Sequence, residues 1–310
     1  MIIILDKKKM IVTREGETIR IAHSSTKFDR VPIYLIKQMI VIGNPMIAAG
    51  VLRLLAERNV SVIFLSERYG KSMAYMGSGL SNTIDIRIAQ HITWNNPIYR
   101  VSVCRWLLNQ KIKGQKQNLL NMQKDEQILN NPIKQLDKCL VEIDNEKGVF
   151  QLMGHEGLAA RVYFSTLKNL LPEKWKFEGR NRRPPKDPVN ALLSYTYTIA
   201  GGHIMQALQK EGLDPALGFL HVNQPNRSSL MLDILEPLRP YLDRFVFQLI
   251  DDVLNVNHFS TNEKTGCKLT KSGRKIFFWD WSDYIESSND GLKVKIKWVM
   301  DAIKKLLKTD

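Results

Sequence analysis

Short apolar runs separated by charged, turn-forming segments characterise the first 80 residues of the chain. The runs are rich in β-branched side chains and too short for helices, which favours strands. Within this region Asn44-Pro45 combines a capping residue with a proline suited to the first helical position, which predicts that a helix begins there. The expected strands lie at residues 2–5, 10–12, 18–22, 31–35 and 60–65.

From about residue 81 onward the apolar positions recur at helical spacing. Asp187-Pro188 predicts the start of a helix, whereas the polar segment 111–124 is expected to be a solvated helix end or a loop. Pro237 and Pro240 are expected to kink or interrupt their helix. Residues 292–298 alternate like a strand and residues 299–306 repeat like a helix. The clearest apolar stripes are Val101, Cys104, Leu108 and Ile112, and then Leu242, Phe245, Val246, Leu249, Ile250 and Val253.

This change of pattern predicts an α+β fold, with a small β-rich N-terminal domain followed by a larger all-α domain. Gly77-Ser78-Gly79 is the best candidate for the junction, because two glycines around a serine carry little order of their own. We therefore expect a β-rich domain at residues 1–77, a linker at residues 78–82 and an α-helical domain at residues 83–310.

Charge is the first indication of function. The 310 residues include 45 Lys and Arg against 31 Asp and Glu, which gives a formal net charge of +14 and a pI near 9.6. Such a balance favours a polyanionic partner, with nucleic acid ahead of an anionic membrane. The alternative is a basic but otherwise ordinary globular protein.

The sequence also bears on location. No apolar run approaches the ~18 residues that a membrane span needs. The apolar residues 1–5 are cut off at once by Asp6-Lys7-Lys8-Lys9, which is typical of a short strand and unlike a signal peptide. We therefore expect a cytoplasmic protein with no membrane partner, in which Cys104, Cys139 and Cys267 are reduced and structural.

Glu156 is the first candidate for chemistry. It lies in the segment 154–164, which is expected to open a helix, and it would share a face with Ala159, Tyr163 and Leu167. An ionised carboxylate on such an apolar face is costly unless a metal ion or an arginine meets it. The alternative is a glutamate in a first helical turn, where the helix dipole favours negative charge.

His221, Asp233 and Glu236 form the second candidate group. Asp233 and Glu236 are three residues apart, so both project from one face of a helix whose other neighbours are apolar. Two buried carboxylates need a cation, an arginine or a shared proton, and a loop would bring His221 back to them. Glu156, His221 and Glu236 would supply two hard oxygen ligands and one imidazole, a set that suits Mg²⁺ or Mn²⁺.

Each of these residues also has a structural interpretation. His221 would then be a core histidine, and Arg227 or Arg239 would pair with the two carboxylates. Other catalytic motifs are excluded by spacing. Position 65 is not the glycine that a phosphate-binding loop ending at Gly70-Lys71-Ser72 requires, and position 159 is not the second histidine of an HExxH zinc site.

A basic segment at residues 173–187 is the third candidate. It interleaves six basic and three acidic residues with Trp175 and Phe177. Arginines bind phosphates bidentately and aromatic rings stack on unpaired bases, so the segment predicts contact with DNA; the alternative is a solvated loop. Its expected DNA-binding residues are Lys174, Lys176, Arg180, Arg182, Arg183 and Lys186.

Five motifs in order resemble those of the CRISPR-associated protein 1 family, the integrase and nuclease of spacer acquisition. Each motif alone is weak, but the ordered set is specific. The resemblance extends back to residues 43–45 and 64–65 and covers nearly the whole chain. The motifs are GHEG at 154–157, RRPP at 182–185, DPVNALLS at 187–194, GFLH at 218–221 and LDILEPLRP at 232–240.

The resemblance implies a β-rich domain that dimerises, a helical catalytic domain, and a homodimer that pairs with CRISPR-associated protein 2. It implies that Glu156, His221 and Glu236 are catalytic metal ligands, although many family members carry aspartate at the last position. Asp233 would be a supporting acidic residue. Tyr197 and Arg227 complete the expected DNA-binding set.

The implied reaction is the attack of a DNA 3′-hydroxyl on a phosphodiester of the CRISPR repeat in double-stranded DNA, assisted by a divalent ion. Water in place of the hydroxyl would give endonuclease activity. The competing hypothesis is a non-catalytic, basic DNA-binding scaffold in which the carboxylates only form internal ion pairs. An RNA-binding module is less well supported, because the chain lacks an RNP signature.

Overall fold

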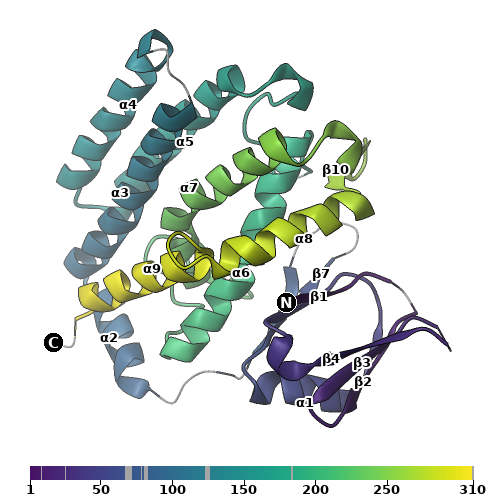
Figure 1. Cartoon of the computed structure of the whole chain (residues 1–310). Coiled ribbons are helices and arrows are strands. Elements are labelled where there is room, and N and C mark those ends of the chain that lie inside the picture. The colour runs from purple at the N-terminus through teal and green to yellow at the C-terminus, as the bar shows by residue number, and fades with distance from the viewer. Residues whose placement is uncertain are drawn as a thin grey trace.

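A computed structural model describes residues 1–7, 9–24, 26–66, 72–77, 79, 83–122, 126–182 and 184–308. Its N-terminal part is strand-rich and lies beside a larger helical part (Figure 1). Two four-stranded sheets form there, one in the order β1-β5-β7-β8 and one in the order β4-β3-β2-β6. The strands are β1 (Ile2–Leu5), β2 (Ile11–Glu15), β3 (Thr18–Ala22), β4 (Phe28–Pro32), β5 (Gln38–Val41), β6 (Met46–Ile47), β7 (Ser61–Leu65) and β8 (Ser72–Met76).

The first sheet is apolar on both faces. Alternate side chains such as Met39 and Val62 pack toward the second sheet and helix α1 (Ala49–Glu57). Their neighbours Ile40 and Ile63 belong to the core of the helical part. This alternation follows from the two-residue period of a strand, and it joins the strand-rich region to the helices through a continuous apolar layer.

The predicted helix is present, but its predicted start at Asn44-Pro45 is wrong. The backbone N–H groups of Met46 and Ala48 donate to the carbonyls of Met10 and Val12, each at 2.9 Å, so this segment pairs with β2 as strand β6. Helix α1 therefore begins only at Ala49. The run predicted as a strand at residues 31–35 is likewise divided, because β4 ends at Pro32 and a 3₁₀ turn, η1 (Ile33–Leu35), follows.

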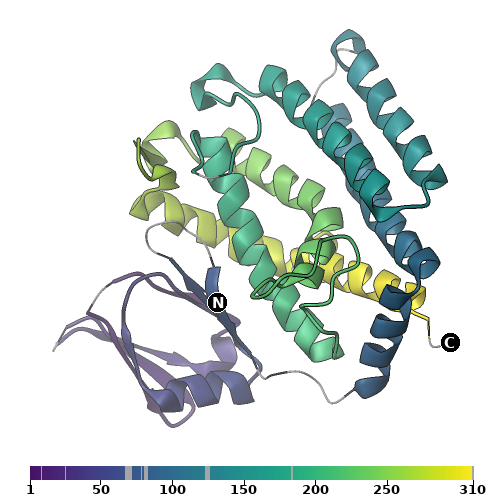
Figure 2. The same ribbon diagram turned by 180° about the vertical axis from the view of Figure 1, so that it is seen from behind.

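Long helices make up most of the remaining chain (Figures 1 and 2). A short hairpin of β9 (Phe259–Asn262) and β10 (Gly266–Leu269) interrupts the predicted all-α character. The fold class is otherwise confirmed: a small strand-rich N-terminal region precedes a helical region. The helices are α2 (Ile84–Asn95), α3 (Pro97–Met122), α4 (Glu126–Asn145), α5 (Val149–Leu170), α6 (Pro188–Glu211), α7 (Ser229–Asp252), α8 (Lys271–Glu286) and α9 (Leu292–Leu306).

Helix α3 continues through most of the segment that was predicted to be a solvated end or loop. Lys111, Gln115 and Asn118 are buried in it, on the stripe that Cys104 and Leu108 begin. Residues 123 and 124 of that prediction lie outside the described residues. The prediction failed because Lys111 and Asn118 are buried against partners on other helices, which the local pattern does not reveal.

Other predictions for the helical part had mixed outcomes. Asp187 caps α6 as expected, since its carboxylate accepts the Asn190 backbone N–H at 2.8 Å. Helix α7 runs without interruption through Pro237 and Pro240. Its apolar stripe ends at Ile250, because Val253 follows the helix and is exposed. The ambiguous C-terminal segment is entirely the helix α9.

The predicted linker at residues 78–82 lies outside the described residues except for Gly79, so the proposed division into domains at 1–77 and 83–310 stays a prediction. Across this junction, α6 packs directly on β7, where a Cβ atom at Gly202 would collide with Ile63. Within the described part of the chain, no helix has an apolar stretch long enough to cross a bilayer.

Candidate metal centre

Three helices that lie side by side, α3, α5 and α7, carry the charged groups of the candidate site (Figure 2). Helices α3 and α7 approach closely because Gly114 lacks a side chain where the Pro240 ring packs; a Cβ there would lie 2.7 Å from the Pro240 Cβ atom. Glu156 lies on α5, about two turns after its first residue, Val149. The prediction that its motif opens the helix is therefore wrong, and the helix dipole does not explain this glutamate.

Lys111 joins two of the predicted ligands. Its ammonium group donates to Glu236 Oε2 at 2.6 Å and also to Glu156 Oε1. The Lys111 side chain is only 5% exposed, and those of Glu156 and Glu236 are 27% and 6% exposed. Carboxylates from α5 and α7 thus converge on one cation from α3. We call Glu156, Glu236, His221 and Lys111 the cradle.

Lys111 was not among the predicted site residues, although the sequence carries a signal for it. The residue lies three, four and seven positions after Leu108, Leu107 and Cys104, all of which are buried. That spacing places it on the inner face of the helix. A lysine on an inner face is almost never fully buried without a partner, so its position alone predicts a buried carboxylate nearby.

Glu236 is held in its ionised form by the cations around it. Burial by itself would raise the pKa of Glu236, but Arg239, Lys111 and His221 outweigh that effect and bring the pKa well below its usual range. Arg239 Nε donates to Glu236 Oε1 at 3.0 Å, and His221 Nε2 lies 3.8 Å from the same oxygen. The structure thus also contains the ion pair between Arg239 and Glu236 that the structural interpretation predicted.

Asp233 has a different environment from Glu236, three residues away on the same helix. Its carboxylate accepts the backbone N–H groups of Phe219, Leu220 and His221 at 2.5, 3.0 and 2.9 Å. It also lies 2.7 Å from His221 Nδ1. Asp233 therefore fixes the loop before α7 and orients the imidazole, so that His221 Nε2 is the nitrogen that faces Glu236.

The donor set fits a small divalent ion. Two carboxylates and the Nε2 of a histidine whose other nitrogen faces a carboxylate are ligands that suit Mg²⁺ or Mn²⁺. Glu156 and Glu236 already share a single cation, the Lys111 ammonium. Among the residues that the structure describes, no three His, Cys, Asp or Glu side chains lie close enough together to bind one metal ion. Lys111 stands between the two carboxylates.

The basic segment 173–187 begins with a 3₁₀ turn, η2 (Glu173–Trp175), and continues as a loop, with its aromatic residues turned inward. Trp175 and Phe177 are buried, and the Trp175 ring packs edge-on against Phe259 at 6.0 Å between ring centroids. The prediction that these rings stack on DNA bases is therefore wrong. Arg183 lies outside the described residues. The exposed cations of the loop are Lys174, Lys176, Arg182 and Lys186.

Arg180 and Arg227, by contrast, are half-buried. Arg180 donates to Asn190 Oδ1 at 2.7 Å and to Ser194 Oγ at 3.1 Å, and burial lowers its pKa to about 10. It therefore helps to hold the loop against α6. Arg227 precedes α7, and among the described residues it forms no ion pair with Asp233 or Glu236.

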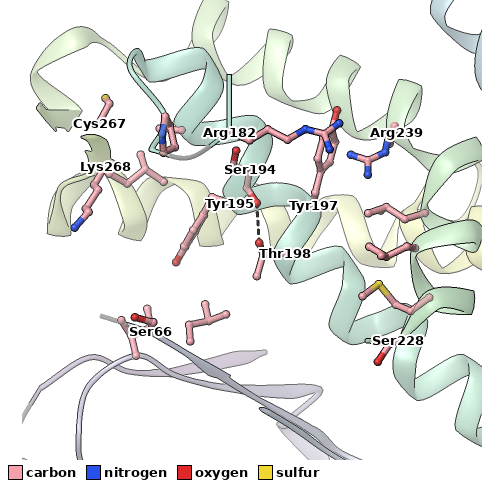
Figure 3. Close-up of a pocket in the computed structure, with 18 of the residues that line it drawn as sticks. Ser66, Arg182, Ser194, Tyr195, Tyr197, Thr198, Ser228, Arg239, Cys267 and Lys268 are labelled. Carbon is pink, nitrogen blue, oxygen red and sulfur yellow. Dashed lines mark hydrogen bonds between the residues drawn. The ribbon is translucent and has the colours of Figure 1, made fainter. Parts of the chain in front are cut away.

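A cavity of about 620 Å³ is lined by residues of the basic loop and by Arg239, although no cradle residue lines it. Figure 3 shows Arg182, Tyr197 and Arg239 along its helical side, and Ser66 of the strand-rich region opposite them. The Arg239 guanidinium lies 4.5 Å from the centre of the Tyr197 ring and also binds Glu236. Arg239 is thus shared between the cavity and the cradle, and the cavity supplies a positive wall next to the candidate ligands.

Tyr197 is buried and its hydroxyl donates to Asp243. Burial raises the pKa of Asp243 to about 6, although the hydrogen bond from Tyr197 opposes that rise. Burial and Asp243 together raise the pKa of Tyr197. Tyr197 therefore remains a neutral phenol whose proton is directed away from the cavity, while its ring supports Arg239.

Several solved structures share this fold. A casposase bound to an integration product matches with a TM-score of 0.84 at 21% identity, over 98% of this chain and 90% of that one. A Cas1 protein from Thermotoga maritima gives 0.82 at 22% identity, over 98% and 96% of the two chains. At these identities the likeness establishes the fold alone, which is the fold of Cas1 proteins.

The sequence comparisons establish the family. Residues 3–283 match the family described as CRISPR associated protein Cas1. One relative, the CRISPR-associated endonuclease Cas1 1 of Thermodesulfovibrio yellowstonii, is 30% identical over 92% of this chain and 91% of that protein. Another of the same name, from Chlorobaculum tepidum, is 31% identical over 85% and 80%. The chain belongs to the Cas1 family, which confirms the resemblance seen in its motifs.

Proposed function

We propose that this protein is a divalent-metal-dependent DNA endonuclease and strand transferase of CRISPR adaptation. It would insert spacer DNA into the CRISPR array through attack of a DNA 3′-hydroxyl on a repeat phosphodiester. The observation that carries this proposal is the convergence of Glu156 and Glu236 on one cation beside His221. Family membership and relatives named as endonucleases support it.

The proposed ligands are Glu156, His221 through Nε2, and Glu236. A bound Mg²⁺ or Mn²⁺ ion would polarise the target phosphate and stabilise the charge that develops during in-line displacement. Glu236 is ionised already in the fold, as metal binding requires. Asp233 keeps Nδ1 of His221 engaged and so leaves Nε2 for the ion.

The other charged groups would hold DNA against the cradle. Glu156 and His221 are the more exposed cradle residues, at 27% and 20%, so the cradle opens toward solvent on their side. The cations of the basic loop and the cavity would bind phosphates and set the position of the strand without reading its sequence. These are Lys174, Lys176, Arg180, Arg182, Arg183, Lys186 and Arg227, with Tyr197 as support for Arg239.

The proposed assembly is a homodimer formed through residues 1–77, in complex with CRISPR-associated protein 2. Structural neighbours titled as Cas6-RT-Cas1–Cas2 complexes support this partner. The proposed substrate is double-stranded DNA carrying the CRISPR repeat, which places the protein in the cytoplasm with that DNA. A neighbour described as a casposase bound to an integration product supports DNA strand transfer.

A non-catalytic DNA-binding scaffold is the second candidate, and one observation favours it. Both carboxylates of the cradle already have cationic partners within the chain, Lys111 and Arg239. Such internal pairs would satisfy Glu156 and Glu236 without any metal ion. The scaffold would still bind DNA through its basic loop, but it would neither cleave nor join strands.

An integration assay separates the two candidates. The purified protein, CRISPR-associated protein 2, a spacer duplex and a repeat-bearing plasmid are combined with Mg²⁺ or Mn²⁺, or with a chelator. We expect metal-dependent strand transfer that Glu156→Ala and His221→Ala abolish while circular dichroism stays native. Asp137→Asn, which removes an exposed carboxylate paired with Lys116, serves as the matched control. Strand transfer that persists in either folded alanine variant would rule out the proposed ligands.

A further inference from the structure

Lys111 is the one cradle residue for which the proposed reaction gives no role. It extends from α3 into the space between α5 and α7, and its side chain is 5% exposed. Its ammonium contacts the two carboxylates that are proposed to bind the metal ion. A lysine on the solvent side of those carboxylates would leave the position between them open to a metal ion. The Lys111 ammonium instead occupies that position.

Both carboxylates of the cradle have cationic partners without a metal ion. Two carboxylates, Glu156 and Glu236, face two cations, Lys111 and Arg239. The remaining pair, Asp233 and His221, is held together separately at 2.7 Å. A divalent ion that took both carboxylates would meet the Lys111 ammonium in direct contact. Like charges at that distance repel strongly in a site this buried.

We propose that Lys111 is the resident cation of the metal-free cradle, and that it competes with the divalent ion for Glu156 and Glu236. This rests on the metal site proposed above. Lysine suits such a role because its charge is compact and its four-carbon stem is flexible, so the ammonium can swing away when the ion enters. Lys111 thereby holds the two carboxylates close together before metal binding, and it weakens metal binding when no DNA is present.

The same argument gives a role to the substrate. A DNA phosphate brings a negative charge to the cradle. That charge offsets the excess positive charge that arises when the divalent ion and Lys111 are both present. DNA and metal ion should therefore strengthen each other's binding, as linkage requires. Replacing Lys111 by a neutral residue should reduce this mutual strengthening, because the excess positive charge is then smaller.

Mn²⁺ binding to the purified full chain, followed by electron paramagnetic resonance, tests the proposal without an activity readout. Lys111→Met should bind Mn²⁺ roughly tenfold more tightly or better, since a charge within about 4–6 Å changes ionic equilibria by at least that factor. Lys111→Arg, which keeps the charge, should show no such gain. Lys116→Met is the matched control. Lys116 lies on the same helix as Lys111 but outside the cradle, and it pairs with Asp137 of α4.

Metal-free protein supplies a second readout. Lys111→Met should unfold at a lower temperature than the wild type, because Glu156 and Glu236 then repel each other, and saturating Mn²⁺ should restore more of its stability than it adds to the wild type. If Lys111→Met does not fold, the wild type still decides the question. The ¹⁵N resonance of the Lys111 ammonium, assigned by its loss in Lys111→Arg, should shift as Mg²⁺ saturates the site.

The outcomes are distinct. Equal or weaker Mn²⁺ binding by folded Lys111→Met, or an ammonium resonance unchanged at Mg²⁺ saturation, overturns the competition and leaves the metal site standing. If neither the wild type nor Lys111→Met binds Mn²⁺, the metal site of the proposed function fails together with this inference. Tighter binding by Lys111→Met that Glu156→Gln abolishes supports both.

Discussion

The cradle and the basic loop both concentrate charge, but they do so in opposite ways. The cradle gathers charged groups from α3, α5, α7 and the loop before α7, and most of them are buried against one another. In the basic loop, Lys174, Lys176, Arg182 and Lys186 are exposed, while Trp175 and Phe177 anchor the backbone. Charges that depend on one another should respond strongly to single substitutions, whereas separate exposed charges should respond weakly and additively.

Removing a cradle carboxylate should have the largest effect. Glu236→Gln leaves Lys111 and Arg239 without their shared partner, and breaking a buried pair in this way costs about 3–5 kcal/mol of folding free energy. Strand transfer should fall on the order of a hundredfold or more. Denaturant unfolding and the integration assay measure the two effects. A Glu236→Gln variant that unfolds and reacts like Asp137→Asn would show that the cradle charges are independent after all.

Asp243 should make stability depend on pH. Because burial raises its pKa from 3.8 to about 6, the folded protein binds this proton more tightly than the unfolded chain does. Its ionisation therefore destabilises the fold as pH rises from about 4 through 6, by roughly 3 kcal/mol in total.

Asp243→Asn should remove this dependence, so its unfolding free energy relative to the wild type should improve between pH 4 and pH 7. The matched measurement on Asp137→Asn should show no comparable trend, since that carboxylate is 48% exposed. A difference between Asp243→Asn and the wild type that stays constant across this range would contradict the buried-charge account.

Asp233→Asn should have an intermediate effect. The amide can accept from some of the three backbone N–H groups, but its own N–H₂ would face the others and would release His221. Loss of such a supporting carboxylate typically costs 10- to 100-fold in metal affinity or activity, so we expect a loss of about that size. Mn²⁺ titration measures it. Unchanged affinity would mean that His221 does not need Asp233 for its orientation.

Neutralising the loop cations should have the smallest effects. Arg182→Gln and Lys186→Gln should each reduce the salt dependence of duplex DNA binding by about one phosphate contact, a slope change of ~0.9. The double variant should show the sum, because exposed, separate charges act independently. Lys138→Gln, on α4 at the edge of the molecule in both views, is the control (Figures 1 and 2). If one loop substitution abolished DNA binding outright, that residue would depend on its neighbours as the cradle charges do, which would contradict the expected independence.

The sequence predicted those features that local chemistry determines. Asp187-Pro188 begins α6 because capping and the fixed proline φ act within one turn. The apolar stripe of α7 follows from its period, and the ordered motifs identified the family. The helix start and the apolar stripe are determined within a few residues, whereas the family was identified from the order of motifs along the chain.

The features that were missed depend on segments distant along the chain. Strand β6 forms because β2 lies beside it, which no local pattern at Met46 reveals. Lys111 is buried because α5 and α7 bring Glu156 and Glu236 to it. Trp175 turns inward because β9 offers a surface to pack on. In each case a polar or aromatic residue was interpreted by its type, while tertiary contacts decided its environment.

A crystal structure of the full chain grown with Mn²⁺, with the ion located by its anomalous scattering, tests the central claim most directly. The account predicts one strong peak bound by Glu156, Glu236 and His221 Nε2, with the Lys111 ammonium moved out from between the carboxylates. An anomalous peak elsewhere, or a saturated crystal in which Lys111 still bridges Glu156 and Glu236, would contradict it.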